Sequence, residues 1–277
     1  MKRNAMSLKA IINNIAKENN VSAQSILQTY MLERLLERIS ISKYKNNFIL
    51  KGGMLISAML GIDSRTTMDM DTTIKGFKLT EENISKIINE ICNISIDDEV
   101  NFEVKKIELI REDDDYGGYR VTFEAKYMDT MPVNITTGDI ITYKEIKYSF
   151  DLMLEDRKIE IWSYNIETII AEKFESIVKR GILGTRVRDY YDVYMLLNTQ
   201  SKNIDFEVLK SAIYSTAEHR NTTEIIKDSQ KVIGELNSSD TMKKQWERYK
   251  KDNFYARDIE YENLIESLKK IEKIISN

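Results

Sequence analysis

Two aspartates separated by one residue are the clearest chemical signal in the sequence. Asp69 and Asp71 fall in residues 68–74, a segment whose composition predicts a strand. Residues two apart in a strand project from the same face, so both carboxylates should point the same way. Neighbouring hard oxygen ligands suit Mg²⁺, which proteins hold with a few carboxylates while substrate phosphates complete the coordination. Taken alone, however, such a pair on a strand edge is most often simply solvated.

A glycine pair precedes these aspartates. Residues 46–50 form a short apolar run that predicts a strand, and Lys51-Gly52-Gly53 closes it. Glycines let the backbone approach a ligand closely, and a helix predicted at about 54–60 would offer free N–H groups to a phosphate. A Gly-Gly pair alone is usually just a turn. We interpret the combination of strand, glycine turn, helix and Asp-x-Asp strand as functional.

The single cysteine, Cys92, and the single histidine, His219, limit the chemistry available to the chain. One cysteine permits no intrachain disulfide and no Cys-rich zinc site. One histidine excludes the two-His helical zinc motif and makes a Ser-His-Asp triad a poor explanation. Acid–base and metal chemistry therefore fall mainly on Asp, Glu, Lys or Tyr.

Composition also sets expectations for location and partners. Apolar residues make up 42% of the 277 residues, which predicts a folded globular protein. The net charge of −4 gives no overall attraction to nucleic acid, although 41 Lys and Arg residues leave room for a local basic patch. No apolar stretch approaches the ~18 residues that span a bilayer, and residues 1–11 lack the apolar core of a signal peptide. We therefore expect a cytoplasmic protein with no membrane partner.

The character of the chain changes near residue 163. Before it, the pattern predicts two amphipathic helices within 7–40, a helix capped by Thr80, and several further strands at 100–110, 119–127, 133–137, 146–154 and 158–161. After it, the pattern is helical, with helices at about 166–179, 187–198, 204–218, 222–235, 239–252 and 257–275. The sequence therefore predicts an α/β catalytic domain over residues 1–163 and a helical domain over residues 164–277.

A second group of charged residues falls in the helical part. Lys173 lies in the first predicted helix, Arg186 directly precedes the second, and Asp189 and Asp192 lie within it. The two aspartates are three residues apart and therefore share a helix face. An exposed helix carrying surface ion pairs is the usual explanation for such charges, so spacing alone leaves their role open.

Together these segments resemble a known family. Lys51-Gly52-Gly53 followed by Arg65-Thr66-Thr67-Met68-Asp69-Met70-Asp71 is similar to the nucleotide-binding signature of the polymerase beta type nucleotidyltransferases, and is closest to the AbiEii/AbiGii toxins. Residues 167–174 and 186–192 resemble the downstream motifs of the same toxins. The resemblance spans roughly residues 45–200.

The resemblance implies a fold and a set of roles. The fold would be an α+β or α/β nucleotidyltransferase core with a mixed sheet, followed by a helical domain that completes the active site. Asp69 and Asp71 would bind Mg²⁺ or Mn²⁺. Lys173 would neutralise charge on the triphosphate as the leaving group departs, and Asp192 would orient either that lysine or the substrate. The implied nucleotide-binding residues are Lys51, Gly52, Gly53, Arg65, Thr67, Arg186 and Asp189.

The sequence departs from the superfamily at two positions. Gly53 is followed by Met54, so the serine contact to the phosphate found in many relatives would be missing. Many members also carry a third carboxylate on a later strand, and the matching position here is Asn134, which cannot act as a base. Asp139 matches the toxin family's own pattern, although a turn aspartate explains it equally well. The general base therefore stays open.

The resemblance further implies a bacterial toxin of an abortive-infection or type IV toxin–antitoxin pair, with a cognate antitoxin encoded nearby. Its co-substrate would be an NTP, with GTP among the candidates, and its acceptor RNA, especially the tRNA 3′ end. One alternative is nucleotidyl transfer to a protein or small molecule. Another is a catalytically degenerate module that binds an NTP or a partner, which Met54 and Asn134 would favour.

Overall fold

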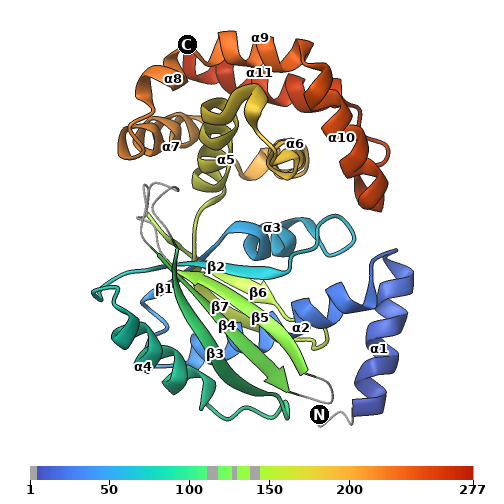
Figure 1. Cartoon of the computed structure of the whole chain (residues 1–277), viewed down its shortest axis with the longest axis vertical. Helices are drawn as coiled ribbons and strands as arrows, with labels where there is room; N and C mark the ends of the chain where they lie inside the picture. The colour runs from blue at the N-terminus through green and yellow to red at the C-terminus, as the bar shows by residue number, and fades with distance from the viewer. Residues whose placement is uncertain (1–4, 111–117, 127–129, 138–143, 277) are drawn as a thin grey trace. The chain divides into compact units, whose positions relative to one another are not determined.

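The computed structural model describes residues 5–110, 118–126, 130–137 and 144–276, and it divides into two compact units (Figure 1). The N-terminal unit comprises Met1–Ile141 and Glu145–Ser163. The C-terminal unit comprises Thr142–Lys144 and Tyr164–Asn277. None of the described helices is both long and apolar enough to cross a membrane.

A seven-stranded mixed sheet forms the centre of the N-terminal unit, in the order β3-β4-β5-β2-β1-β7-β6. Its strands β1 to β7 are Phe48–Lys51, Asp69–Ile74, Asn101–Ile110, Gly118–Lys126, Thr130–Thr137, Ile146–Asp151 and Lys158–Ser163. The pairs β1–β7 and β2–β5 are parallel and the remaining pairs antiparallel. A mixed sheet followed by helices is the expected fold class, which the structure confirms.

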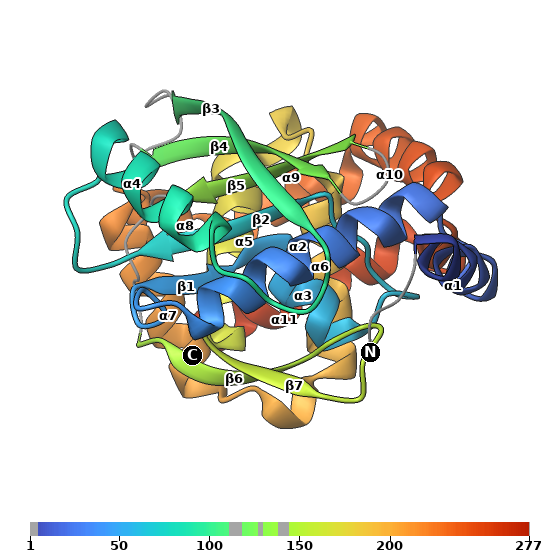
Figure 2. The ribbon, with the colours of Figure 1, turned by 90° about the horizontal axis from the view of Figure 1, so that it is seen from below.

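Four helices accompany this sheet, namely α1 (Ala5–Glu18), α2 (Ala23–Ile41), α3 (Gly52–Leu60) and α4 (Glu81–Cys92). α2 and α4 pack against one another and against the sheet (Figure 2). In β2 the residues Met70, Thr72 and Ile74 are buried on one face, whereas on the other face Asp69 is exposed, Asp71 half-buried and Thr73 buried. The period-2 alternation of the strand thus places the apolar residues in the core and the two aspartates on the opposite face.

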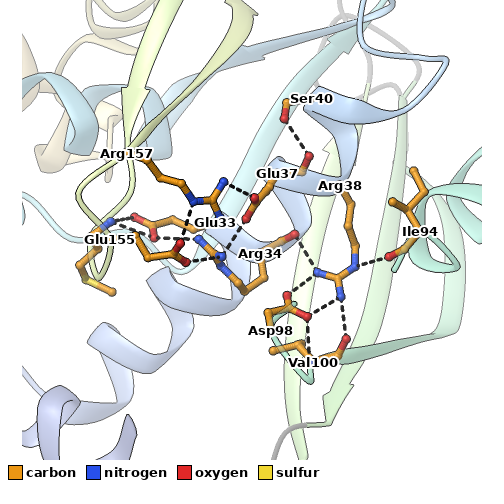
Figure 3. Close-up of polar contacts among 11 residues, drawn as sticks. Glu33, Arg34, Glu37, Arg38, Ser40, Ile94, Asp98, Val100, Glu155 and Arg157 are labelled. Carbon is orange, nitrogen blue, oxygen red and sulfur yellow. Dashed lines mark hydrogen bonds and ion pairs between the residues drawn. The ribbon is translucent and has the colours of Figure 1, made fainter. Parts of the chain in front are cut away.

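α2 differs from the amphipathic helix that the sequence predicts, because every residue from Gln28 to Ile39 is buried. Four of them have ionisable side chains, and each of these lies in a polar network (Figure 3). Arg38 forms a bidentate pair with Asp98, at 2.6 and 2.9 Å, and Arg34 lies 2.7 Å from Glu37. Buried charge is tolerated when it is paired in this way. The spacing of the apolar residues alone could not show that these ionisable positions of α2 are buried as well.

The C-terminal unit is entirely helical in its described part. Helices α5 to α11 are Ile166–Arg180, Val187–Thr199, Phe206–His219, Thr223–Lys227, Ser229–Ser238, Asp240–Asp252 and Tyr261–Ser276. The single helix predicted over 222–235 is wrong, since Asp228 interrupts it with ψ 12°. Aspartate competes for backbone hydrogen bonds and so favours helix ends. The last helix starts at Tyr261, four residues later than predicted, after a 3-10 turn at Phe254–Ala256.

Aromatic residues build the core beneath α6. Trp246 is fully buried and donates its indole N–H to the carbonyl of Ile259 at 2.9 Å. Tyr191 of α6 lies with its ring centroid 5.1 Å from that of Tyr255 and 6.1 Å from that of Tyr249. These contacts fix the rotation of α6 and therefore the direction in which its acidic residues point.

Candidate active site

Three adjacent strands bring the predicted site residues of the N-terminal unit together. Lys51 of β1 is the register partner of Asp71 in β2. On the other side of β2, Asp69 pairs with Asn134 of β5, and Asp71 pairs with Thr136. Directly paired residues on neighbouring strands project from the same face of the sheet. The five side chains therefore share the face opposite Met70, Thr72 and Ile74 of β2.

The glycine turn lies directly against these carboxylates. Gly52 has φ +64°, the left-handed region that glycine adopts without strain, and it is the first residue of α3. A Cβ atom at Gly52 would overlap the Asp71 carboxylate. A Cβ atom at Gly53 would lie 2.6 Å from Thr67 Oγ1 and 3.0 Å from Arg65 Nη2. Gly52 is thus favoured by both its backbone conformation and the close approach of Asp71, whereas Gly53 is favoured by close approach alone.

The N-terminus of α3 suits an anion. Its N-cap residue is Lys51, whose side chain carries only donors and cannot accept a hydrogen bond from the first N–H groups of the helix. Uncapped N–H groups and the helix dipole together favour a phosphate at this end. The turn therefore combines backbone donors with the two aspartates across the β1–β2 pair.

Arg65 and Thr67 occupy the segment that leads into β2, as the motif suggests. Arg65 is buried, with its guanidinium next to Gly53, and its carbonyl accepts a hydrogen bond from the Ser57 hydroxyl. Thr67 donates its hydroxyl to the carbonyl of Asp69 at 3.1 Å. A permanently charged guanidinium is therefore held beside the glycine turn, where it can interact with phosphate oxygens.

Hydrogen-bond donors from β5 contact both aspartates. Asn134 donates from Nδ2 to Asp69 Oδ1 at 3.3 Å, and Thr136 donates its hydroxyl to Asp71 Oδ1. Thr122 of β4 in turn donates to Asn134 Oδ1 at 2.9 Å. The motif comparison did not single out Thr122 or Thr136. Thr136 could have been found, because it lies two residues after Asn134 and so on the same strand face.

Gln28 of α2 is a further residue that the sequence did not reveal. Its buried amide donates to the carbonyl of Met68, at 3.0 Å, and to that of Pro132, at 2.9 Å. The Met68 residue directly precedes Asp69, and Pro132 lies two residues before Asn134, the register partner of Asp69. Gln28 therefore joins the two strands where their site residues begin. No local signal could identify it, because its partners are 40 and 104 residues away in the chain.

The donor set fits a hard divalent cation that a substrate helps to bind. Asp69 and Asp71 supply carboxylate oxygens from adjacent same-face positions of β2. Within the described ranges, no group of three or more His, Cys, Asp or Glu residues could hold a metal ion. Mg²⁺ is ordinarily bound by one or two carboxylates plus phosphates and water, so two carboxylates beside a phosphate-binding turn suffice.

The four charged residues that the sequence singles out in the C-terminal unit also lie close together. Lys173 Nζ of α5 lies 2.6 Å from Asp189 Oδ1 and 2.8 Å from Asp192 Oδ2 of α6. Arg186, whose side chain is 59% exposed, places Nε 2.9 Å from Asp189 Oδ2. The side chains of Asp189 and Asp192 are 4% and 0% exposed. The explanation as solvated surface ion pairs is therefore wrong for both aspartates.

The electrostatic balance keeps Lys173 charged. Burial by itself would lower the pKa of Lys173, but the Asp192 and Asp189 carboxylates outweigh it and the pKa is raised. Because Asp192 is fully buried against the ammonium, its position favours orienting the lysine over touching a substrate. Asp139, the possible third acid, lies outside the described residues.

Comparison with known proteins adds a family and a fold. The family model described as "Nucleotidyl transferase AbiEii toxin, Type IV TA system" matches residues 34–270, most of the chain. No curated protein matches the sequence.

Solved structures with the same fold include MenT4, a nucleotidyltransferase toxin from Mycobacterium tuberculosis. It aligns with a TM-score of 0.56 at 12% identity, over 97% of this chain and 98% of its own. A candidate nucleotidyltransferase from H. pylori aligns with a TM-score of 0.53 at 15% identity, over 92% and 96%. JHP933 from Helicobacter pylori aligns with a TM-score of 0.52 at 14% identity, over 92% of each chain. At these identities the likeness shows the fold alone.

Proposed function

Because the chain belongs to the AbiEii family of nucleotidyl transferase toxins of type IV toxin–antitoxin systems, we propose that it transfers a nucleoside monophosphate from an NTP to an acceptor and releases pyrophosphate. The observation that carries this proposal is the close approach of the Gly52 turn to the Asp71 carboxylate, with Asp69 on the same face of β2. A phosphate-binding turn and a cation-binding pair within contact distance are what phosphoryl transfer requires.

In this proposal Asp69 and Asp71 hold Mg²⁺ or Mn²⁺. Such an ion would polarise the reacting phosphoryl group and offset the charge on the triphosphate. The N–H groups at the start of α3 accept the phosphates of the NTP, and Gly52 and Gly53 leave the space for them. Arg65 adds a fixed positive charge at the same turn, with Thr67 holding the start of β2.

Lys173 takes the second role that the family motifs imply. We propose that its ammonium stabilises negative charge on the departing pyrophosphate, and that Asp192 and Asp189 hold it in place. Arg186 is the most exposed cation of this cluster and would contact the nucleotide.

The acceptor we propose is RNA, in particular the tRNA 3′ end. Its support is the resemblance of both motif groups to the AbiEii/AbiGii toxins. Membership of a toxin–antitoxin family implies a cognate antitoxin, which we propose is encoded nearby. NTPs and tRNA are cytoplasmic, so we propose that the protein acts there.

The direct test mixes the purified chain with Mg²⁺, total tRNA and each NTP labelled at the α-phosphate. We expect label in the tRNA, and at least about a hundredfold less with Asp69→Asn or Asp71→Asn, a loss of ~2.7 kcal/mol in transition-state stabilisation. Asp151→Asn, which changes a 73%-exposed aspartate on β6, is the matched control and should transfer label normally.

Two other outcomes separate the alternatives. Label on a protein or metabolite of a cell extract, with tRNA left unlabelled, would assign a different acceptor. No transfer to any macromolecule or metabolite with all four NTPs, combined with toxicity that survives both aspartate substitutions, would leave a non-catalytic binding module as the explanation.

A further inference from the structure

We propose that Asn134 closes the β5 side of the Asp69–Asp71 pair to a second divalent cation, so that this chain works with a single cation bound together with the NTP. This inference rests on the proposed function, because it concerns the same two aspartates. It assigns Asn134 a positioning and specificity role that follows from the direction of its amide.

The direction of the Asn134 amide is determined by its two neighbours. Thr122 donates its hydroxyl to Asn134 Oδ1 at 2.9 Å, which turns the amide oxygen toward β4. The amide nitrogen consequently faces β2 and donates to Asp69 Oδ1 at 3.3 Å. Only the oxygen of an asparagine side chain can coordinate a hard cation, whereas its NH₂ group carries two donor protons. The side of Asn134 that meets Asp69 is therefore the side that cannot bind a metal.

Strand register makes this arrangement a property of the sheet. Asn134 is the register partner of Asp69 across β2–β5 and of Thr122 across β4–β5. Three side chains from three adjacent strands thus form one row, in which hydroxyl, amide and carboxylate follow each other as donor and acceptor. Turning the amide over would place its NH₂ against the Thr122 hydroxyl and its oxygen against the Asp69 carboxylate, which would lose the bond to Asp69.

Charge balance points the same way. Asp69 and Asp71 together carry a formal charge of −2 when ionised, so the charge that the protein itself contributes to this row matches one divalent cation, before the charge of the triphosphate is counted. The other group that β5 contributes is the neutral hydroxyl of Thr136, which donates to Asp71 Oδ1. A second cation about 4 Å from the first would be repelled by it, and neither β5 side chain in this row supplies a negative charge to offset that repulsion.

The experiment counts Mn²⁺ bound to the full chain in the presence of α,β-methylene analogues of the four NTPs, which cannot be cleaved at the reacting bond. Electron paramagnetic resonance gives the number of bound ions, and two ions a few ångström apart give a spin-coupled spectrum. We expect one uncoupled Mn²⁺ per chain in the wild type. Asn134→Asp should bind a second Mn²⁺ and give the coupled spectrum, because it replaces the NH₂ group with a carboxylate.

Asn134→Ala is the matched control, since it removes the amide without adding a ligand, and it should still bind one Mn²⁺. Two coupled ions in the wild type, both lost in Asp69→Asn, would overturn this inference and leave the proposed function standing. No Mn²⁺ bound with any analogue would instead contradict the proposed function itself. A single Mn²⁺ in Asn134→Asp of native thermal stability would also overturn the inference. Should that variant fail to fold, the wild-type count alone decides.

Discussion

The ammonium of Lys173 lies 2.8 Å from a carboxylate oxygen of Asp192, and the Asp192 side chain has no exposed surface. Asp189 provides the second carboxylate, at 2.6 Å. The lysine is therefore held from two points of α6, one of them wholly buried. A cation held in this way is pre-positioned, and in the proposed reaction it would need little reorganisation when charge develops on the leaving group.

Asp192→Asn should weaken both folding and transfer. The change leaves Lys173 paired with Asp189 alone, so the cost should lie below the about 3–5 kcal/mol that is lost when a buried charge keeps no partner. Urea unfolding would measure this loss, and the labelled-NTP assay should show slower transfer. The exposed Asp258→Asn is the matched control and should change neither. Equal stability of the two variants would show that Asp192 does not hold the lysine.

Gly52→Ala should impair the site more than the fold. Alanine would be strained at φ +64°, a cost of about 1–3 kcal/mol, and its Cβ would displace the Asp71 carboxylate. We expect a lower melting temperature together with loss of transfer and of Mn²⁺ binding.

Gly234→Ala provides the opposite control. Gly234 lies inside α9, and a Cβ atom there would meet nothing within 4 Å. Alanine should therefore stabilise the protein by about 0.5–1 kcal/mol. If both substitutions had the same effect on Mn²⁺ binding, the close approach of Gly52 to Asp71 would be irrelevant to the site.

Glu33 should make the stability of the N-terminal unit depend on pH. Burial raises the pKa of the Glu33 carboxyl from 4.5 to about 8, with Glu155 and Glu37 adding to the rise, while the Met153 N–H and Arg34 oppose it (Figure 3). Between these two pKa values the folded state keeps a proton that the unfolded state releases. The free energy of unfolding should therefore fall as pH rises from about 4.5 to about 8, by about 1.4 kcal/mol per pH unit for this group.

Glu33→Gln tests this dependence because it mimics the protonated form at every pH. Its amide oxygen can still accept the Met153 N–H, which lies 3.0 Å from Glu33 Oε1. Chemical unfolding between pH 5 and pH 8 should show a flatter profile for the variant and a stability advantage at pH 8. The exposed Glu160→Gln should keep the wild-type slope. A slope unchanged by Glu33→Gln would mean that Glu33 is ionised in the folded state.

Gln28→Leu should loosen the parallel β2–β5 pair. The substitution removes the donor to the carbonyls of Met68 and Pro132 while keeping a similar shape. Leaving buried acceptors without that donor should cost about 1–3 kcal/mol. We expect faster amide exchange in β2 and β5 and weaker Mn²⁺ binding. Gln24→Leu, at an exposed position one turn earlier in α2, should leave exchange in these strands as it is.

The sequence by itself determined the local features of this protein. The alternation around Met70 placed Asp69 and Asp71 on one face, and the glycine pair marked the turn before α3. Both follow from strand periodicity and backbone conformation, which depend on neighbouring residues alone. The sequence also allowed prediction of the mixed sheet, the helical second part and the family, because the motifs lie in order along most of the chain. The catalytic roles of the residues stay predictions.

Only the tertiary structure decided what surrounds the aspartates. Thr122, Asn134 and Thr136 come into register with β2 through strand pairing, and Gln28 reaches the same strands from α2. Strand register and helix docking depend on packing of the whole core. A local sequence pattern therefore cannot predict which distant residues come into contact. The same reason explains why the sequence predicted an amphipathic α2. The residues that pair with its buried charged positions, namely Asp98, Glu155 and Arg157, come from distant segments of the chain.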